Sequence, residues 1–582
     1  MAISTSSLSG LTIKRMDHLG LVSGMCRELG IAKMIDAVIP KNNEHKVTHG
    51  EAFVAMLLNG LGFHSRTLHM FADFFADKPT ERLIGPGVKA KHLNDDVLGR
   101  CLDALYEADV SSLYQVMAER VVDTLGLASN AVHLDITSFH VDGEYAVDEQ
   151  DSETKRIELV KGYSRDHRPE LNQVILELIC ENQAGIPVYM QALSGNTNDQ
   201  KAFAEVTRHH IQCLKAAQQC RYFVADAALY TEESITALAT QNQLFISRVP
   251  MTIKDARQHV SNVTEASLTA MGNGYHGCWV DADYAGVKQK WLILRSEQAT
   301  KREQQTLARN LLKSSEKEHK QFIKLCKQRF ACQTDAETAM KVFSKTLKTT
   351  RISEFDCIAH PVFLGKGRPK KGQQPAYYEY QLDGLIATCL DKVGIAQAQT
   401  GMFILATNDC SGELSMQTLL DTYKSQQHVE RGFRFLKSPE FLTSSLFLKK
   451  PERIEALLMV MTCSLMIYAA LEHRIRTSLK ERQQYFPDMK KKPSQKPTAR
   501  WVFLCFSGIH EVSIGDSPPV ITDKQERQQV IIDVLGTLYQ EIYSVSDLKS
   551  ALYAVFGTFQ GNNASNFSTV VASAILSSTY LM

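Results

Sequence analysis

The sequence predicts an α/β protein whose core of alternating strands and helices is preceded by a helical region and interrupted by an insertion. Three observations predict this fold class. Residues 130–250 alternate short runs of β-branched and aromatic residues with segments of helical periodicity. Residues 15–130 carry apolar residues at helical spacing. Finally, two acidic positions in otherwise ordered segments, Asp226 and Glu430, lie 204 residues apart (430 − 226), which is too long for a loop in a compact domain.

The N-terminal region is expected to be a set of helices. Ser, Thr, Asp or Asn residues stand near the starts of its apolar segments, as is typical of helix N-termini. The expected helices cover residues 21–39, 48–63, 94–106 and 111–127. The pattern leaves two interpretations open, a small structural helical bundle or a domain that binds DNA ends and could contain a helix-turn-helix.

The core is expected to hold five strands and two helices. Val132, Leu134 and Ile136 give the first strand its character, and Asp135 stands in its middle. Asp226 follows directly on a later strand. The expected strands are 131–139, 172–180, 187–193, 221–226 and 244–248, and the expected helices are 199–218 and 231–242. This pattern alone would also permit a doubly wound sheet.

The stretch 423–437, YKSQQHVERGFRFLK, is expected to form one amphipathic helix. Its apolar residues Val429, Phe433 and Leu436 fall on a single face. Glu430 lies beside that face, and an acid there usually has a partner. Two strand aspartates and one helix glutamate are the oxygen ligands that a pair of divalent ions needs to act on a phosphodiester.

These residues resemble the DDE transposases of bacterial insertion sequences. The helix is similar to that family's pattern of Tyr, two residues, Arg, three residues, Glu, six residues and Lys. Tyr423, Glu430 and Lys437 match the pattern, whereas Gln426 stands where the family has Arg. Further phrases that resemble the family are GYSRDHRPELNQVILEL (162–178), LSGNTND (193–199), FILATN (403–408) and RIEALLMV (453–460).

The resemblance implies both a fold and a chemistry. It implies an RNase H-like catalytic core whose β-rich insertion supports strand transfer over the active site. It also implies that Asp135, Asp226 and Glu430 are catalytic and hold Mg²⁺ or Mn²⁺, two ions in all. Tyr423 and Lys437 would then contact DNA, and Gln426 could hydrogen-bond the DNA without bringing a charge. The implied partners are double-stranded DNA, namely the terminal inverted repeats and the target, and a second copy of the chain in the DNA complex.

The insertion is expected to combine strands with a charged helical segment. Residues 277–284, 289–297 and 377–390 are strand-like, whereas residues 300–350 are helical and rich in Lys, Arg, Glu and Gln. A narrow apolar seam in that helical segment favours a solvated helical hairpin over a coiled dimer contact.

A basic segment, residues 364–375, lies inside the insertion. It holds Lys366, Arg368, Lys370 and Lys371, and its Gly-Arg-Pro core resembles an AT-hook. Pro369 would keep the backbone extended so that Arg368 lies in a narrow minor groove while Lys370 and Lys371 reach phosphates. A flexible basic loop without groove preference is the alternative. A second basic segment, 489–500, is expected to be solvated and to touch DNA nonspecifically.

Five domains are expected from these boundaries. They are a helical N-terminal domain (1–128), two parts of the RNase H-like core (129–250 and 401–480), the inserted subdomain (251–400), and a basic linker with a C-terminal region (481–582). Residues 451–475 are strongly apolar and are expected to form a helix that packs behind the catalytic one.

Composition narrows the class of protein. Apolar residues make up 44% of the 582 residues, enough for a large core. There is no run of 18 uncharged apolar residues and no secretory signal, so we expect no membrane span. The 13 cysteines form no C-x-x-C pair, which argues against structural zinc and for a reducing cytoplasm. The resemblance implies that this cytoplasm is bacterial. The net charge of +1 means that any DNA contact must come from local basic surfaces.

The expected function is a transposase that cleaves DNA at the ends of an insertion sequence and transfers the freed strand. Two alternatives stay open. One is a nuclease of the same fold that cuts without joining strands, and the other is an inactive DNA-binding relic or repressor. The complete set of three carboxylates argues against the relic.

Overall fold

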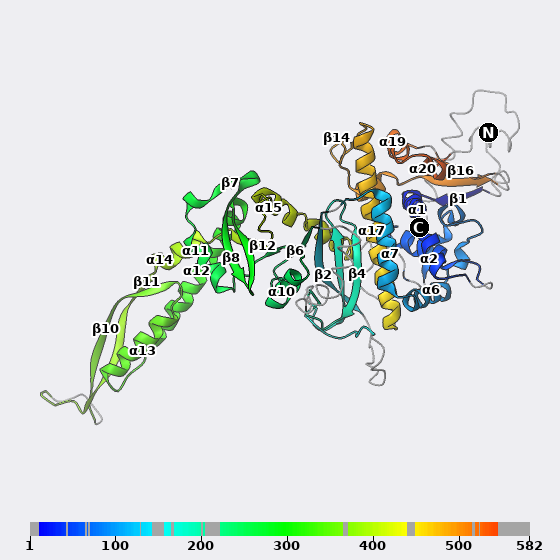
Figure 1. Ribbon diagram of the computed structural model, residues 1–582. Coiled ribbons are helices and arrows are strands. Elements are labelled where there is room, and N and C mark those ends of the chain that lie inside the picture. Colours follow the sequence, from blue (N-terminus) through cyan, green and yellow to red (C-terminus); the bar gives the residue numbers. More distant parts are fainter. Residues whose placement is uncertain are drawn as a thin grey trace, which may run out of the picture. The chain divides into compact units, whose positions relative to one another are not determined.

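The computed structural model describes residues 11–41, 45–63, 67, 70–128, 130–141, 156–163, 168–198, 202–203, 221–364, 371–438, 448–514, 518–522 and 524–544. The chain divides into two compact units. Unit 1 comprises Met1–Ala202, Gln212–Arg221 and Ser425–Met582, and unit 2 comprises Phe203–Ile211 and Tyr222–Lys424. The positions of the two units relative to one another are not determined (Figure 1).

Unit 1 is a helical assembly on one face of a small sheet. Its helical elements are α1 (Leu19–Glu28), α2 (Ile31–Val38), α3 (His49–Gly60), α4 (Phe71–Ala76), α5 (Thr80–Leu83), η3 (Ala90–His92), α6 (Asp95–Glu107), α7 (Val110–Leu125), α16 (Gln427–Leu436), α17 (Pro451–Glu481), α18 (Ala499–Cys505), α19 (Glu526–Leu535) and α20 (Thr537–Ile542). Its strands are β1 (Leu11–Arg15), β2 (Ala131–Val141), β3 (Asn172–Glu181), β4 (Pro187–Ser194), β13 (Phe486–Pro487), β14 (Pro493–Ser494), β15 (His510–Ile514) and β16 (Val520–Ile521).

Helix α17 is the central element of unit 1 (Figure 1). Pro451 stands at its start, where a missing N–H costs nothing. The helix packs against α1, α3, α6, α7, α16, α18, α19 and β4. It is long and apolar enough to cross a membrane by composition, but 83% of its most apolar window is buried inside the protein. The expected core helix behind α16 is therefore confirmed, and it extends beyond the predicted 451–475.

The N-terminal helices follow the sequence pattern closely, with one break. Residues 21–39, predicted as one helix, form α1 and α2, because Gly30 adopts a left-handed conformation (φ 71°) between them. Helix α3 begins with a capping box in which Thr48 and Glu51 satisfy each other's backbone N–H. The predicted helices at 94–106 and 111–127 are confirmed as α6 and α7.

The two ends of the described chain meet in unit 1. Strand β1 pairs antiparallel with β15, which in turn pairs with β16. The Tyr543 hydroxyl donates to the Asp17 carbonyl (2.7 Å) and accepts from the Leu21 N–H (3.1 Å). Gly20 and Gly24 of α1 leave room for the rings of Tyr543 and Tyr539. The described C-terminal region is thus packed into the N-terminal helices and is not a separate appendage.

The sheet of unit 1 is antiparallel, in the order β4-β3-β2. All three strands lie where the sequence predicts them. In β2, Asp135 is paired with Leu178 of β3, and the odd-numbered side chains share one face because side chains alternate along a strand. Phe139 and Val141 on that face belong to the same apolar core as α16 and α17. Asp135 therefore stands on the helix-covered face of the sheet.

Unit 2 is a mixed sheet flanked by helices, with a projecting arm. Its strands are β5 (Tyr222–Ala225), β6 (Leu244–Arg248), β7 (Thr269–Met271), β8 (Tyr275–Tyr284), β9 (Val287–Ser296), β10 (Thr350–Val362), β11 (Tyr377–Thr388) and β12 (Met402–Thr407). Its helical elements are α10 (Glu232–Thr240), α11 (Lys254–Asn262), η4 (Glu265–Ser267), η5 (Gly272–Gly274), α12 (Glu297–Cys326), α13 (Gln333–Thr346), α14 (Leu390–Ala398) and α15 (Met416–Lys424).

The main sheet of unit 2 runs in the order β5-β6-β12-β9-β8-β7, with β5 and β6 parallel and the other pairs antiparallel. The predicted hairpin at 277–284 and 289–297 is confirmed as β8 and β9. It does not form a sheet of its own, because β9 pairs along its length with β12. Of the described strands of unit 2, β10 and β11 lie outside this sheet, in the segment from α12 to β11.

That segment forms the arm, in which α12 and α13 lie along the β10–β11 hairpin (Figure 1). Phe322 of α12, Met340 of α13 and Leu382 of β11 form its small core. The apolar seam predicted for residues 300–350 is therefore used partly against the hairpin. Glu318 accepts hydrogen bonds from the N–H groups of Lys348 and Thr350, both at 2.9 Å. The helix predicted at 199–218 lies almost entirely outside the described residues.

Candidate active site

The stretch 423–437 is not one helix, as predicted, but two. Helix α15 ends at Lys424 and α16 begins at Gln427. Neither Gly nor Pro causes the break. At the break, Ser425 Oγ lies 2.8 Å from Nε2 of the buried His133 ring of β2. Tyr423 and Glu430, predicted to line one side of one helix, therefore lie on different helices and in different units.

Helix α16 is held tightly in unit 1 by its apolar face. Val429, Phe433 and Leu436 are buried, as the periodicity predicts. Behind them, the Phe435 ring lies 4.4 Å from the Tyr468 ring of α17. Gly432 permits this close approach, because a Cβ there would come within 2.8 Å of Leu465. The helix that carries Glu430 thus has a fixed position between α17 and β2.

Two contacts give the direction of α16 along β2. Near its start, Ser425 Oγ lies 2.8 Å from His133 Nε2. At its end, the Lys437 ammonium lies 5.7 Å from the centre of the Phe139 ring. His133 and Phe139 are both odd-numbered residues on the helix-covered face of β2. The helix therefore runs alongside the strand in the same direction.

This direction brings Glu430 level with Asp135. Asp135 lies two residues beyond His133, or about 7 Å along an extended strand. Glu430 lies five residues beyond Ser425, or about 7.5 Å along a helix. Glu430 is exposed and Asp135 is partly exposed, so both carboxylates are open to solvent. Two of the three predicted acids, Asp135 and Glu430, therefore lie at about the same distance along β2 and along the neighbouring α16.

Asp226 belongs to unit 2, directly after β5. One of its carboxylate oxygens accepts from the Ala228 N–H (2.9 Å), and its backbone carbonyl accepts from the Ser247 hydroxyl (2.8 Å). These bonds hold an exposed carboxylate at the carboxyl end of a parallel strand, where α/β proteins commonly place functional groups.

The donor chemistry of the three acids suits a hard cation. Carboxylate oxygens are the ligands that Mg²⁺ and Mn²⁺ prefer. Within the part of the chain that the structure describes, no group of three or more His, Cys, Asp and Glu side chains is placed to hold a metal ion. Of the predicted ligands, Asp135 and Glu430 belong to unit 1 and Asp226 belongs to unit 2.

The predicted DNA contacts fall in different surroundings. Tyr423 is partly buried on α15, and Lys437 is partly exposed at the end of α16. Gln426 is only 8% exposed, so its predicted DNA contact stays a prediction that burial does not support. Arg368 and Lys370 of the AT-hook-like segment lie outside the described residues. Lys371 is exposed near the end of the arm.

Sequence reasoning missed two arginines on α16. Arg431 and Arg434 are exposed on the same helix as Glu430, opposite its buried face. Their spacing could have indicated this, because Arg434 lies four positions from Glu430 on the same side of the helix, and Arg431 lies opposite the buried residues.

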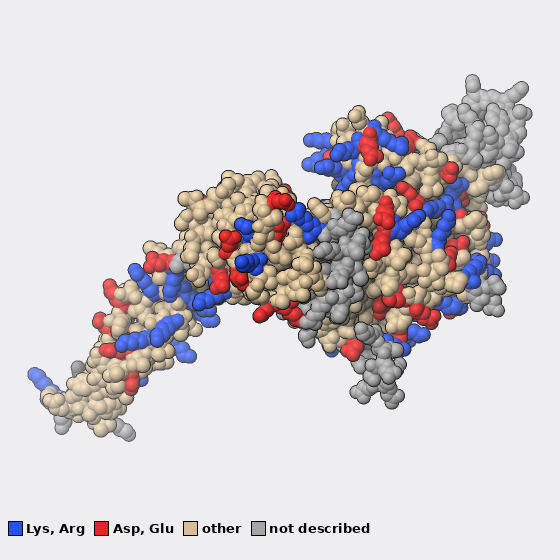
Figure 2. Space-filling view, in the orientation of Figure 1, with Lys and Arg blue, Asp and Glu red and all other residues tan. Residues whose placement is uncertain are grey.

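A basic surface lies at the C-terminal end of α17. Figure 2 shows Lys and Arg side chains gathered where Figure 1 places β14, and Lys490, Lys491 and Lys492 are exposed there. This is the basic segment that the sequence predicts to be solvated.

Comparisons with known proteins identify the family to which most of the chain is similar. Residues 139–467 match the family model of the transposase DDE domain, and residues 11–119 match a domain of unknown function, DUF4277. None of the curated proteins compared with the chain is significantly similar to it. A solved structure, the piggyBac transposase synaptic complex with hairpin DNA, is 9% identical with a TM-score of 0.36, covering 96% of this chain and 89% of that one. That likeness is too weak to support an argument.

Proposed function

Because the chain belongs to the family of the transposase DDE domain, we propose that it binds the ends of an insertion sequence and catalyses metal-dependent cleavage and transfer of DNA strands there. The matched segment covers more than half of the chain and includes Asp226 and Glu430, while Asp135 lies four residues before it. The family match shows that the protein is a transposase. What we propose is the reaction that it catalyses, the residues that carry out that reaction and the DNA ends that it binds.

The single observation that carries the proposal is the register of α16 on β2. It is supported by two contacts, Ser425 with His133 and Lys437 with Phe139. A glutamate on a helix is ordinarily solvated and without a role. A glutamate that is level with a strand aspartate, on a helix held at both ends by contacts with that strand, supports the proposal that the two acids share a ligand.

Asp135, Asp226 and Glu430 would hold the divalent ions that this family generally uses, two Mg²⁺ or Mn²⁺ ions in our proposal. When bound, such ions supply Lewis acidity that favours attack on a phosphodiester and departure of its 3′ oxygen. Water would attack the phosphorus at the element end and displace the 3′ oxygen, which leaves a 5′ phosphate. The freed 3′-OH would then attack a second phosphodiester, forming a bond to its phosphorus and displacing the 3′ oxygen of that strand. No covalent bond to the protein is needed, so the chain requires no serine or tyrosine nucleophile.

The other predicted residues would position DNA. Lys437 is a point charge suited to a phosphate, and Tyr423 has a hydroxyl for the same purpose. We add Arg431 and Arg434, because both are exposed beside Glu430. A homodimer on two element ends, and the terminal inverted repeats and target DNA as partners, complete the proposal.

Substitution of Glu430 by Gln tests the proposal. The change keeps the shape of the side chain and removes its charge, so the site loses an anionic ligand that Mg²⁺ requires. We expect cleavage of a duplex carrying the DNA that flanks the gene to fall by at least about 10²–10³. Gel-shift binding of the same duplex should be unchanged.

Glu481→Gln is the matched control, since Glu481 is an exposed acid at the end of α17. It should cleave like the wild type. Near-normal cleavage by Glu430→Gln would remove Glu430 from the site. Cleavage by the wild type without any joined product would favour the nuclease, and no cleavage at all would favour the inactive relic.

A further inference from the structure

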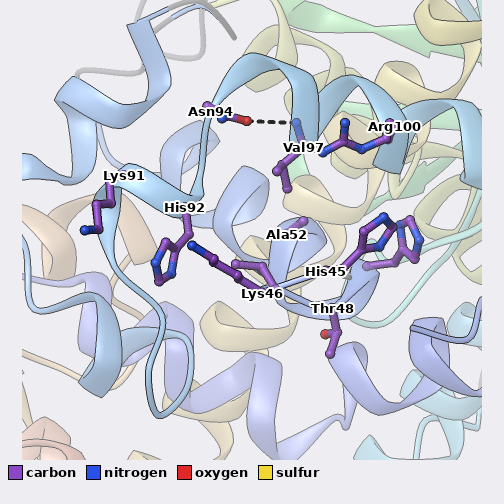
Figure 3. A pocket seen from close by; sticks show the side chains of 11 residues that line it. His45, Lys46, Thr48, Ala52, Lys91, His92, Asn94, Val97 and Arg100 are labelled. Carbon is purple, nitrogen blue, oxygen red and sulfur yellow. Dashed lines mark hydrogen bonds between the residues drawn. The ribbon is translucent and has the colours of Figure 1, made fainter. Parts of the chain in front are cut away.

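A basic pocket lies between the starts of α3 and α6 in the N-terminal region, far from the acids in sequence. Its volume is about 240 Å³. Its lining comes from the loop before α3, from α3 itself, from η3 and from the first turns of α6 (Figure 3). The lining residues are His45, Lys46, Val47, Thr48, His49, Ala52, Lys91, His92, Asn94, Val97 and Arg100.

The charged residues that line this pocket are all of one sign. Three of its lining residues, Lys46, Lys91 and Arg100, are cations, and none of the eleven is acidic. Figure 3 shows Lys46 next to His92, with Lys91 beyond it and Arg100 entering from α6. All three cations are exposed at the pocket, so their charges are available to a ligand from solvent.

Acids near the pocket already have backbone partners. The Asp36 carboxylate accepts from the Gly50 N–H at 2.7 Å, and the Glu51 carboxylate accepts from the Thr48 N–H at 2.8 Å. Asp95 and Asp96 are exposed in the first turn of α6 and are not part of the lining. These acids reduce the positive charge of the region but do not enter the pocket.

Two helix N-termini add to the positive charge. Helices α3 and α6 are 12 and 13 residues long, and both begin at the pocket with a side-chain cap, Thr48 and Asn94. The positive end of each helix dipole therefore points toward the space that the cations line.

Two histidines of the pocket, His92 and His49, have lowered pKa values. Burial lowers the pKa of His92, and the charges of Lys46 and Lys91 lower it further. Burial also lowers the pKa of His49, helped by His45 and Arg100 and opposed by Asp36. The charges of Lys46 and Lys91 at His92, and of Arg100 at His49, thus act in the direction expected of a positive lining, while burial has the larger effect.

We propose that this pocket binds a phosphate of the DNA backbone, and that the N-terminal region is the part of this transposase that holds duplex DNA through it. The inference rests on the proposed function for the nature of its ligand. It also gives a role to residues 11–119, which match a domain of unknown function.

The chemistry favours a backbone phosphate over other ligands. Pockets for small organic molecules are mostly apolar and have volumes of about 300–1,000 Å³, whereas this pocket is smaller and lined by charged and polar groups. Its three histidines form no metal cluster among the described residues. Lys and Arg side chains together with helix N-termini are the usual partners of DNA phosphates.

The double variant Lys46→Ala/Arg100→Ala tests the pocket. The full chain is titrated in EDTA with a 40-bp duplex of gene-flanking DNA at several NaCl concentrations. Each neutralised phosphate contributes about 0.9 to the slope of log K against log salt, so loss of the one phosphate held in the pocket should reduce that slope by about 0.9. Binding at low salt should weaken on the order of tenfold.

Lys33→Ala/Arg120→Ala is the matched control. It removes the same net charge from exposed helical positions outside the lining, and we expect a slope close to that of the wild type. The variant Lys46→Arg/Arg100→Lys keeps both charges and should also bind like the wild type, which excludes a folding defect at these positions.

An equal effect of the pocket variant and its control would overturn the proposal, as would a wild-type chain that does not bind duplex DNA. Because the titration is done in EDTA, its outcome does not depend on catalysis. Loss of the pocket effect in a chain that still cleaves DNA contradicts only the pocket. A pocket effect in a chain that never cleaves contradicts only the proposed function.

Discussion

We expect Lys437 to act on DNA rather than on the carboxylates. Its ammonium lies over the Phe139 ring, and Phe139 is four residues, or about 13 Å, along β2 from Asp135. We therefore expect Lys437→Ala to weaken engagement of the element end several-fold. The midpoint of a Mg²⁺ titration of cleavage should not change, because the metal ligands are untouched.

Lys437→Arg is the control for this prediction, since it keeps the charge and should retain DNA binding. A large shift of the Mg²⁺ midpoint in Lys437→Ala would contradict our expectation. It would mean that this lysine supports the acids electrostatically.

At this scale, sequence patterns located the acids but not their surroundings. The strand character around Asp135 and the helical spacing around Glu430 depend on near neighbours in sequence, and both survive in the structure. The contacts that align the two residues, such as Ser425 with His133, join positions 292 residues apart. The basic pocket was missed for the same reason, because it depends on how α3, η3 and α6 pack together.

At the scale of single elements, α17 carries an acid, Glu455, whose charged form is less favourable in the folded protein than in the unfolded chain. Burial raises the pKa of Glu455 from 4.5 to about 7, and the negative charges of Asp109 and Glu452 raise it further. The folded state therefore holds a proton that the unfolded state releases between pH 4.5 and 7. Stability must fall with rising pH across that window, by on the order of 3 kcal/mol.

Glu455→Gln should remove this loss. We expect the variant to unfold at a higher temperature than the wild type at pH 8, and at nearly the same temperature at pH 5, as followed by circular dichroism. Glu481→Gln, an exposed acid on the same helix, should show no such difference between the two pH values. A Glu455→Gln variant that gains equally at both pH values would contradict the assigned pKa.

Most helices and strands follow the local periodicity of the sequence. The predictions that differ from the structure do so mainly where contacts between distant parts of the chain decide the outcome. Gly30 divides a predicted helix in a way that its sequence could have signalled. The break between α15 and α16 divides another without any helix-breaking residue. The β8–β9 hairpin was predicted, but its pairing with β12 joins segments more than a hundred residues apart, and no local pattern encodes that.

At the scale of the whole molecule, the domain boundary expected after residue 128 would separate the N-terminal helices from α17, the helix on which they pack. The predicted N-terminal domain contains α1 to α7, and four of these helices pack on α17. Unit 1 likewise joins the N-terminal and C-terminal segments into one body. Domain boundaries inferred from changes in pattern along the chain do not register such long-range packing, so the five predicted domains stay a prediction.

This packing makes a specific prediction for fragments. Residues 1–128 alone would expose the apolar faces that α17 covers and would lose the β15 partner of β1 and the Tyr543 bonds to Asp17 and Leu21. Without α17 these helices bury too little apolar surface to offset the conformational entropy that the chain loses on folding. We expect fragment 1–128 to show no cooperative thermal transition and to be prone to aggregation.

Co-expression with residues 448–544 should restore folding, because that segment supplies α17, β15 and α20 together. The two fragments should copurify and melt in one transition. Tyr543→Phe in the second fragment removes one hydroxyl that both donates and accepts, and should weaken the complex by about 1–3 kcal/mol. Cooperative unfolding of fragment 1–128 by itself would show that the N-terminal region is an autonomous domain and that α17 is only its neighbour.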